Sequence, residues 1–107
     1  MTPNEYQEAA LRTEPPNSNR IFHSAMGCCT ESGELMDILK KTHFYKQPVD
    51  YVNFKEELGD LLWYIAIGAQ GCGTTMEILM QNNIDKLKRR YPEKFTEEHA
   101  KARLDKA

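Results

Sequence analysis

Apolar residues recur at helical spacing through four stretches of this chain, and residues that cap or break helices separate those stretches. The first stretch predicts a short helix capped by Asn4, whose side chain can bind the free backbone N–H groups of the first turn. This helix is expected to end near Thr13, because Pro15 and Pro16 stop a helix and bias the preceding residue to extended backbone. Residues 14–19 are therefore predicted to form a loop.

The second stretch predicts a long helix over about residues 20–41, followed by a connector over 43–48. Lys40 and Lys41 suit the carboxyl end of such a helix, where the helix dipole favours positive charge. The apolar positions with nearly helical spacing are Ile21, Ala25, Cys28, Leu35, Ile38 and Leu39. This stripe predicts an amphipathic helix.

A third helix is predicted over about residues 50–70 and a fourth over about 76–90, with a break at Gly71-Cys72-Gly73 between them and Pro92 after the second. The apolar stripe of the third helix consists of Val52, Leu58, Leu61, Leu62, Ile65 and Ala69. A weaker amphipathic segment over 97–106 predicts a short terminal helix or a mobile tail. Because no segment alternates as a strand does, we expect an all-α fold: a helical bundle of four main helices with a short C-terminal helix or tail, completed by homo-oligomerisation.

Length and composition indicate one small globular domain over residues 1–107, with a core so modest that self-association would help it. The formal net charge of −2 gives no overall positive field for nucleic acid. The amino terminus lacks the apolar segment of a signal peptide, and the longest strongly apolar run, Leu61–Ala69, is too short to span a bilayer. Three cysteines without CxxC spacing predict buried thiols in a reduced, cytoplasmic chain.

Two short acidic motifs indicate the chemistry: Glu31-x-x-Glu34 and Glu57-x-x-Asp60. Residues three apart lie on one side of a helix, so each motif places two carboxylates side by side. Two such helices packed face to face put four like charges around one small space, which is costly unless a cation binds there. Mg2+ prefers oxygen ligands and commonly binds protein carboxylates and phosphate groups at the same time, so the pattern predicts metal-assisted phosphate chemistry. Either motif alone is more typical of a solvated helix surface.

A glycine stands inside each acidic motif, at Gly33 and Gly59. Glycine inside a helix costs about 1 kcal/mol relative to alanine, so its presence predicts either close helix approach or room for a ligand. A fifth acid, Glu56, points about 100° away from Glu57 on the helix. That position suits either a role in activating water or a place on the surface.

The fourth predicted helix presents Asn83, Lys86 and Arg90 on one side, because these residues are spaced i, i+3 and i+7. Lysine and arginine at this spacing can bind phosphate, and the planar guanidinium offers two parallel donors. A basic last turn is also common simply because it complements the helix dipole. Beside a site of four carboxylates, phosphate binding becomes the preferred prediction.

The residues that can line a pocket for a nucleobase are His23, Met26, Trp63 and Tyr64. Trp63 and His23 offer flat rings on which a base can stack. Aromatic and methionine side chains at helical spacing nevertheless pack in cores more often than they bind ligands. The chain has no cysteine and histidine spacing typical of a zinc site, and no glycine-rich phosphate loop.

Four strings of this chain, in the same order, resemble small MazG-like nucleoside triphosphate pyrophosphohydrolases of the all-α NTP pyrophosphatase superfamily. The first is Tyr6-Gln7-x-x-Ala10-x-Arg12-Thr13, and the second is His23-x-Ala25-x-Gly27-x-x-x-Glu31-x-Gly33-Glu34. The third is Glu56-Glu57-Leu58-Gly59-Asp60-Leu61-Leu62-Trp63-Tyr64, and the fourth is Asn83-Ile84-x-Lys86-Leu87-x-x-Arg90-Tyr91-Pro92-x-x-Phe95. The resemblance covers most of the chain and is specific at family level.

The resemblance implies an all-α enzyme that uses Mg2+ (or Mn2+) to hydrolyse NTPs or dNTPs to a nucleoside monophosphate and pyrophosphate. The metal ligands that it implies are Glu31, Glu34, Glu57 and Asp60. One of these carboxylates, or Glu56, would orient or deprotonate the attacking water. The family motif is EExxE followed by ExxD, and Thr30 stands at its first acidic position here, which puts a second metal ion in question but not the main site. The resemblance also implies a homodimer or homotetramer with active sites near subunit interfaces.

Two other functions fit the same residues. A related pyrophosphohydrolase acting on a phosphoribosyl-ATP-type nucleotide would use the same acidic helices, and substrate profiling separates it from an enzyme of nucleotide-pool control or sanitation. A non-catalytic helical interaction module would keep the fold without the chemistry. Thr30 favours that module, and the four retained acids argue against it.

Overall fold

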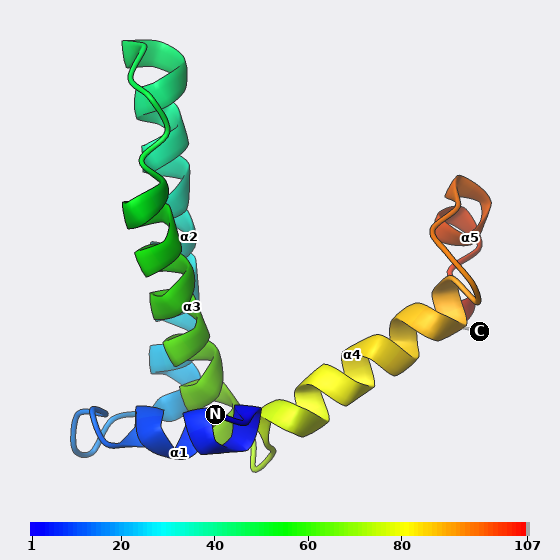
Figure 1. Cartoon of the computed structure of the whole chain (residues 1–107). Helices are drawn as coiled ribbons and strands as arrows, with labels where there is room; N and C mark the ends of the chain where they lie inside the picture. The colour runs from blue at the N-terminus through cyan, green and yellow to red at the C-terminus, as the bar shows by residue number, and fades with distance from the viewer. Residues whose placement is uncertain (107) are drawn as a thin grey trace.

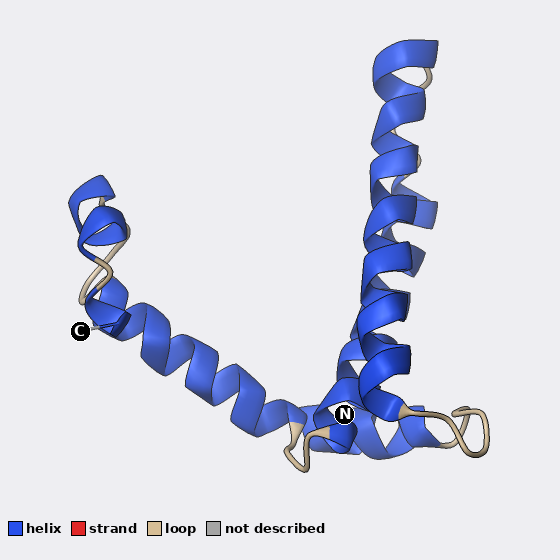
Figure 2. Ribbon diagram, turned by 180° about the vertical axis from the view of Figure 1, so that it is seen from behind, coloured by secondary structure: helices blue, strands red, loops and turns tan. Residues whose placement is uncertain are grey.

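The computed structural model describes residues 1–106, and every regular element in that range is helical (Figure 2). The elements are α1 (Pro3–Leu11), α2 (Arg20–Tyr45), α3 (Tyr51–Gly71), α4 (Met76–Arg90), α5 (Glu97–Ala102) and the 3-10 helix η1 (Leu104–Lys106). The all-α class with four main helices is confirmed, and the segment predicted over 97–106 forms α5 and η1. Residue 107 of the expected domain lies outside the described residues. None of the described helices combines the length and hydropathy that a membrane span requires.

The first helix begins earlier than the sequence predicted, because Thr2 rather than Asn4 is its N-cap. The Thr2 hydroxyl accepts a hydrogen bond from the Glu5 N–H, the Glu5 carboxylate accepts one from the Thr2 N–H, and Pro3 fills the first helical position. Asn4 lies inside the helix and bonds the backbone N–H and the carboxylate of Glu77 at the start of α4. The prediction for Asn4 was wrong, and its amide links two helices instead.

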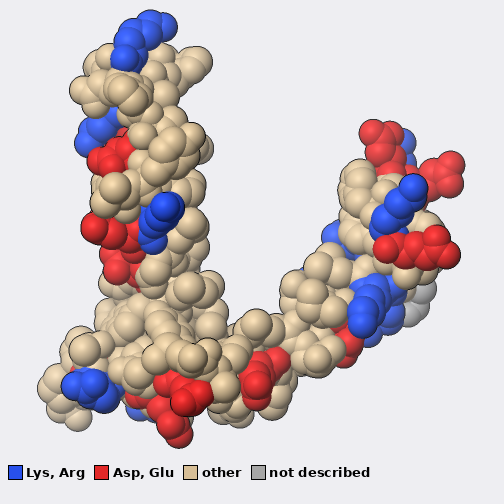
Figure 3. Space-filling view, in the orientation of Figure 1, with Lys and Arg blue, Asp and Glu red and all other residues tan. Residues whose placement is uncertain are grey.

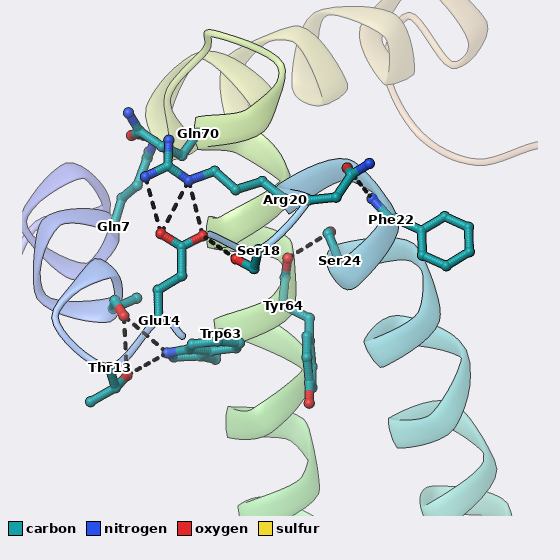
Figure 4. Close-up of polar contacts among 12 residues, drawn as sticks. Gln7, Thr13, Glu14, Ser18, Arg20, Phe22, Ser24, Trp63, Tyr64 and Gln70 are labelled. Atoms are coloured by element: carbon teal, nitrogen blue, oxygen red, sulfur yellow. Dashed lines mark hydrogen bonds and ion pairs between the residues drawn. The ribbon is translucent and has the colours of Figure 1, made fainter. Parts of the chain in front are cut away.

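The predicted loop between α1 and α2 is fastened by the carboxylate of Glu14. It accepts hydrogen bonds from the Arg20 guanidinium, the shortest at 2.9 Å, and from the Ser18 hydroxyl at 3.4 Å (Figure 4). Arg20 also holds the pKa of Glu14 below its ordinary value through these hydrogen bonds. The loop therefore delivers the chain to the start of α2 in a fixed position.

Capping residues set the beginnings of the two long helices, which form an antiparallel hairpin (Figure 1). Asn19 accepts a hydrogen bond from the Phe22 N–H at the start of α2. Asp50 does the same for the Asn53 N–H at the start of α3. Asp50 is therefore the cap of α3 rather than its first residue.

α2 is longer than the sequence predicted. It continues past Lys41 to Tyr45, and Lys46 ends it in the left-handed conformation with φ at 59°. Lys40 and Lys41 consequently lie within the helix, where their ammonium groups pair with Asp37 at 3.4 and 3.3 Å. A basic pair is compatible with a helix end but does not enforce one.

Two glycines allow the helices of the hairpin to approach closely. A Cβ atom at Gly27 would overlap the ring of Tyr64, and a Cβ atom at Gly68 would overlap the Ser24 hydroxyl. Ser24 donates this hydroxyl to the Tyr64 carbonyl at 2.7 Å, which fixes the two helices against each other (Figure 4). The register of the hairpin therefore depends on small residues on both sides.

The predicted apolar stripes of the hairpin are only partly buried. Ile38 is 5% exposed, whereas Ile21 is 51% exposed and Leu39 is 42% exposed. The exposed members of the stripe on α3 are Val52, Leu58 and Leu62. One neighbouring helix covers only part of an apolar stripe, so amphipathicity alone overestimated the burial.

A similar correction applies to the cysteines. All three are free thiols, but Cys29 and Cys72 are exposed and Cys28 is half-buried. The prediction of buried thiols was wrong, because Cys28 borders an open hollow between α2 and α3, Cys29 faces solvent, and Cys72 follows the end of α3.

A small core forms where α1 crosses the base of the hairpin and α4 begins. Its buried members are Ala10, Ala66, Ala69 and Met76, against which Tyr6, Trp63 and Ile65 pack. The Gln7 side chain, 4% exposed, donates from Nε2 to the Gln70 side chain and the Thr74 carbonyl. Its Oε1 accepts from the Met76 N–H at 2.8 Å. One amide therefore joins α1, the end of α3 and the start of α4.

Replacing Gln7 with leucine is expected to lower the free energy of unfolding by about 2 kcal/mol, because the buried Met76 N–H and the Thr74 carbonyl lose their partner. Urea unfolding followed by circular dichroism measures this loss. The control is Gln81→Leu, which removes an exposed side chain bonded to Asp85 of the same helix and should change stability by less than about 0.5 kcal/mol. Equal losses for both variants would contradict the role given to the Gln7 amide.

α4 leaves the base of the hairpin at a wide angle, so the chain has the shape of an open V (Figures 1 and 2). One limb is the hairpin, and the other, here called the arm, consists of residues 76–106. The radius of gyration is 17.0 Å, whereas about 13 Å is expected for a compact chain of this length. Much of both limbs therefore faces solvent in the single chain.

Candidate functional site

The two acidic motifs meet where α2 and α3 run side by side. Glu31 from α2 and Glu57 and Asp60 from α3 each offer one carboxylate oxygen, and these three oxygens lie within 4.8 Å of one another. Figure 3 shows acidic side chains gathered partway along the hairpin. The helical offset of three residues aligns Glu57 with Asp60, and the packing of Gly27 against Tyr64 fixes the register with α2.

Two of these carboxylates each have one buried oxygen without a hydrogen-bond partner among the described residues. Glu57 is 8% exposed and Glu31 is half-buried, and the Oε2 atom of each is buried without a partner among the described residues. Buried carboxylate oxygens without partners are costly, and their mutual repulsion adds to that cost. A hard divalent cation removes both costs because it takes oxygen ligands. The three residues therefore fit a divalent cation and can hold one.

The crowding of the carboxyl groups also changes their pKa values. The pKa of Glu57 is raised, first by its contact with the Glu31 carboxyl and then by loss of hydration. The pKa of Glu34 is raised chiefly by the neighbouring Glu57 carboxyl. A bound cation would favour the ionised forms and so reverse both shifts.

Glu34 and Glu56 occupy the edges of this group. Glu34 is exposed and is not among the three residues whose oxygens converge, although it lies next to Glu57. Glu56 is exposed on another side of α3. The structure thus brings together three of the four predicted ligands and places the fourth beside them.

Glu57→Gln is expected to raise the melting temperature of the metal-free protein at neutral pH, although this substitution removes a candidate cation ligand. A carboxyl whose folded-state pKa lies above its ordinary 4.5 stabilises the fold only while it is protonated. That stability is fully present below pH 4.5 and is lost as the pH rises through the raised value. Glutamine cannot ionise, so it keeps the neutral form at every pH.

Scanning fluorimetry in EDTA between pH 4 and pH 8 tests this prediction for Glu57. The difference between Glu57→Gln and wild type should be largest at pH 8 and should shrink toward pH 4. Glu56→Gln, an exposed neighbour on α3, is the control and should show no such divergence. A Glu57→Gln variant that melts below wild type over the whole range would contradict the argument.

The glycines inside the acidic motifs do not mark close helix approach. A Cβ atom at Gly33 or at Gly59 would meet no atom of the described residues within 4 Å. Of the two explanations that the sequence offered, close approach is therefore wrong. Room for a ligand beside the carboxylates remains a prediction.

His23, Trp63 and Tyr64 form an aromatic group nearer the base of the hairpin. Their rings meet edge to face, with centroids 5.7 Å apart for His23 and Trp63, 5.4 Å for His23 and Tyr64, and 5.1 Å for Trp63 and Tyr64. Trp63 Nε1 donates to the Ala10 carbonyl and to the Thr13 hydroxyl (Figure 4). The indole therefore ties the end of α1 to α3 while its ring remains in the aromatic group.

Two candidates for base contact differ in their surroundings. His23 Nδ1 is buried and has no hydrogen-bond partner among the described residues. Met26 is 55% exposed and takes no part in the edge-to-face contacts. The structure therefore brings His23 together with Trp63 and Tyr64 and leaves Met26 apart.

The predicted phosphate-binding residues lie on the arm rather than beside the carboxylates. On α4, Asn83 is exposed and Lys86 is half-buried. The Arg90 guanidinium forms two hydrogen bonds with Asp105, at 3.0 and 3.1 Å, and lies 5.8 Å from the Tyr91 ring. It also holds the pKa of Asp105 far below its ordinary value. Arg90 thus fastens η1 to the end of α4, and within one chain these residues and the acidic group belong to different limbs of the V (Figure 1).

Tyr6 belongs to the surroundings of the site, although the sequence analysis assigned it no role. Its pKa is raised first by burial and then by the negative charge of Asp60. α1 therefore places a phenol within the electrostatic field of the carboxylates. The sequence signal was its position in the first of the four strings that carry the family resemblance.

Comparison with known proteins gives one match. The sequence model of a family described as the MazG nucleotide pyrophosphohydrolase domain matches residues 24–95, about two thirds of the chain. The matched segment contains all the predicted metal ligands and all the predicted phosphate-binding residues. Neither the curated proteins nor the solved structures compared with the chain give a match.

Proposed function

Because the chain belongs to the MazG nucleotide pyrophosphohydrolase family, we propose that it uses Mg2+ to hydrolyse NTPs or dNTPs to the monophosphate and pyrophosphate, in nucleotide-pool control or sanitation. The supporting observation is the pair of buried carboxylate oxygens, on Glu31 and Glu57 beside Asp60, that find no partner in the described part of the chain. Such a group suits a hard cation that is shared with a phosphate chain. Mn2+ has the same preference for oxygen ligands and is the expected substitute.

In the proposed reaction, water attacks a phosphorus atom of the bridge between the α- and β-phosphates, and the P–O bond of that bridge breaks. Mg2+ bound to the acidic group would act as a Lewis acid on the phosphate oxygens. Glu31, Glu57 and Asp60 would hold the cation, with Glu34 completing the set. Glu56, or a carboxylate oxygen of this set that does not bind the cation, would take the proton that the attacking water loses.

We propose Asn83 and Lys86 as contacts to the phosphate chain. Arg90 has the charge for the same task, but its guanidinium already binds Asp105. Since the arm is separate from the hairpin, the proposed homodimer or homotetramer offers a way to bring the arm of one protomer to the carboxylates of another. The basic helix would then neutralise the triphosphate electrostatically.

Lys86→Ala is expected to raise KM roughly tenfold while leaving the melting temperature almost unchanged, because it removes a charged phosphate contact. Arg90→Ala is expected to lower the melting temperature and to expose the C-terminal residues to protease. Steady-state kinetics and limited proteolysis measure the two effects. Lys88→Ala, an exposed neighbour on α4, is the control, and a loss equal to that of Lys86→Ala would contradict the assignment.

For the nucleoside end, we propose the aromatic group of His23, Trp63 and Tyr64, with Met26 at its margin. The buried His23 Nδ1 supports this, because a hydrogen-bond partner from a ligand would satisfy it. The Trp63 N–H is already bonded to α1, so Trp63 would offer only the face of its ring.

The chain offers no general positive field for nucleic acid, so we propose nucleotides rather than polymers as its ligands. The three free cysteines agree with the reducing, cytoplasmic compartment that we propose for this reaction.

A panel of canonical and modified NTPs and dNTPs, incubated with the purified protein and Mg2+, tests the function. Monophosphate and pyrophosphate should form together, and EDTA should stop their formation. Orthophosphate as the first product would show that a different bond breaks. Turnover of a phosphoribosyl-ATP-type nucleotide alone would favour the related pyrophosphohydrolase, and no turnover of any substrate would favour a non-catalytic interaction module.

A further inference from the structure

One side of α2 is left largely uncovered by the residues that the structure describes, although its N-terminal part borders an open apolar hollow that it shares with α3 and the start of α4. The residues that line this side follow one another at spacings of three and four. Because each residue turns the helix by 100°, all of them point within about 40° of the direction of the central residue, Ser32. These residues, here called the Ser32 stripe, are Ile21, Ala25, Cys28, Ser32, Met36 and Leu39. Cys28 is half-buried, the other five are exposed, and no charged residue interrupts the stripe. An uncharged stripe along a 26-residue helix is typical of a helix–helix interface.

The accessible surface of the chain indicates how much area a partner would cover. It amounts to 8010 Å2, whereas about 6,100 Å2 is expected for a compact monomer of 12.4 kDa. The excess is about 1,900 Å2 per chain, or nearly 4,000 Å2 for two chains. That area lies in the range of obligate homodimer interfaces, which bury roughly 2,000–5,000 Å2 in total.

The Ser32 stripe is complementary to itself when reversed. Its N-terminal half has the small residues Ala25 and Cys28 beside an apolar hollow of about 280 Å3, and its C-terminal half has the large residues Met36 and Leu39. In an antiparallel pair centred on Ser32, small residues of each helix would face large residues of the other. The Ser32 hydroxyl already donates to the Cys28 carbonyl at 2.8 Å, so it can be buried at the centre without losing a partner.

We propose that two copies of this chain associate through the Ser32 stripe, with α2 of each copy antiparallel to α2 of the other and the two-fold axis passing beside Ser32. Ala25 then faces the partner's Leu39, and Cys28 faces the partner's Met36. This contact is isologous, so it closes a dimer and does not propagate into a fibre. It assigns an interface to the self-association proposed above and rests on it.

Single cysteines test the register without any measurement of turnover. In a background of Cys28→Ser, Cys29→Ser and Cys72→Ser, we would add Ser32→Cys and treat the protein with a short bismaleimide reagent. Because Ser32 lies at the two-fold axis, this variant should give a covalent dimer in high yield. Asp37→Cys is the matched control and should give little, because Asp37 lies on another side of α2 with its side chain 47% exposed.

Two further variants test the antiparallel pairing. Ala25→Cys and Leu39→Cys should each crosslink poorly alone and efficiently when mixed, because each position faces the other across the interface. Equal yields at positions 32 and 37 would overturn the proposal, and so would a mixture that crosslinks no better than its components.

A measurement with the native cysteines guards against misfolding of the substituted background. Wild-type chain should have the mass of a dimer or a higher even oligomer in light scattering, and Ser32→Arg should shift it to monomer while helix content by circular dichroism is retained. A monomeric wild type, or a Ser32→Arg variant that keeps its oligomeric mass, would refute this interface. Crosslinking and mass are independent of turnover, so an inactive but correctly crosslinked dimer would refute the proposed reaction alone.

Discussion

Asp60→Asn is expected to reduce pyrophosphate release by roughly a hundredfold or more, because it removes a proposed charged ligand from a site that would hold the cation with few others. Asparagine keeps the size of the side chain and one oxygen, so the effect reports charge and not shape. The affinity for the cation should fall as well, which titration calorimetry with Mg2+ measures separately from turnover. The two measurements together connect the loss of activity to the loss of the ion.

The control for Asp60→Asn is Asp37→Asn. Asp37 is also a carboxylate of the hairpin, but the ammonium groups of Lys40 and Lys41 already neutralise it. Its replacement should change turnover less than about threefold, as expected for an exposed ion pair of small energy. Full Mg2+-dependent activity in Asp60→Asn would remove Asp60 from the site.

Gly27→Ala is expected to destabilise the fold by about 3 kcal/mol, although alanine is the better helix former. The added methyl group would occupy space filled by the ring of Tyr64. Tyr64 cannot simply move away with its helix, because its carbonyl is bonded to Ser24 at 2.7 Å. The hairpin must therefore open or the ring must leave the aromatic group, and unfolding in urea measures the cost.

Gly59→Ala is the matched control, since it makes the same change in the other helix of the hairpin. Within residues 1–106, a Cβ atom there would meet no other atom within 4 Å, so the gain in helix propensity should stabilise the fold by about 1 kcal/mol. The two substitutions should thus differ in sign. A Gly27→Ala variant as stable as Gly59→Ala would show that the close approach at Tyr64 does not hold the hairpin together.

Local signals in the sequence predicted the helices well, because caps and helix breakers act on neighbouring residues. The fourth helix occupies the range 76–90, as the Gly71-Cys72-Gly73 break and Pro92 predicted. Its direction could not be predicted in the same way. The Gln7 amide fixes the turn before α4, and nothing near that turn in the sequence indicates a contact with α1.

The candidate site was partly predictable for a similar reason. A spacing of three residues puts Glu57 and Asp60 on one side of a helix whatever else the chain does. Which glycine meets a neighbouring helix depends instead on the register of the hairpin. The sequence drew attention to Gly33 and Gly59, whereas the close contacts of the hairpin occur at Gly27 and Gly68.

Trp63 gives the chain a built-in optical probe. It is the sole tryptophan in the sequence, so the intrinsic emission excited near the red edge of protein absorption comes from one place. That place is the junction where Trp63 Nε1 bonds the Ala10 carbonyl, one helical turn from Asp60. Detachment of α1 would expose the indole to water and shift its emission to longer wavelength. The fluorescence of unlabelled protein can therefore report, in real time, whether addition of a divalent cation strengthens or weakens the attachment of α1 to the base of the hairpin.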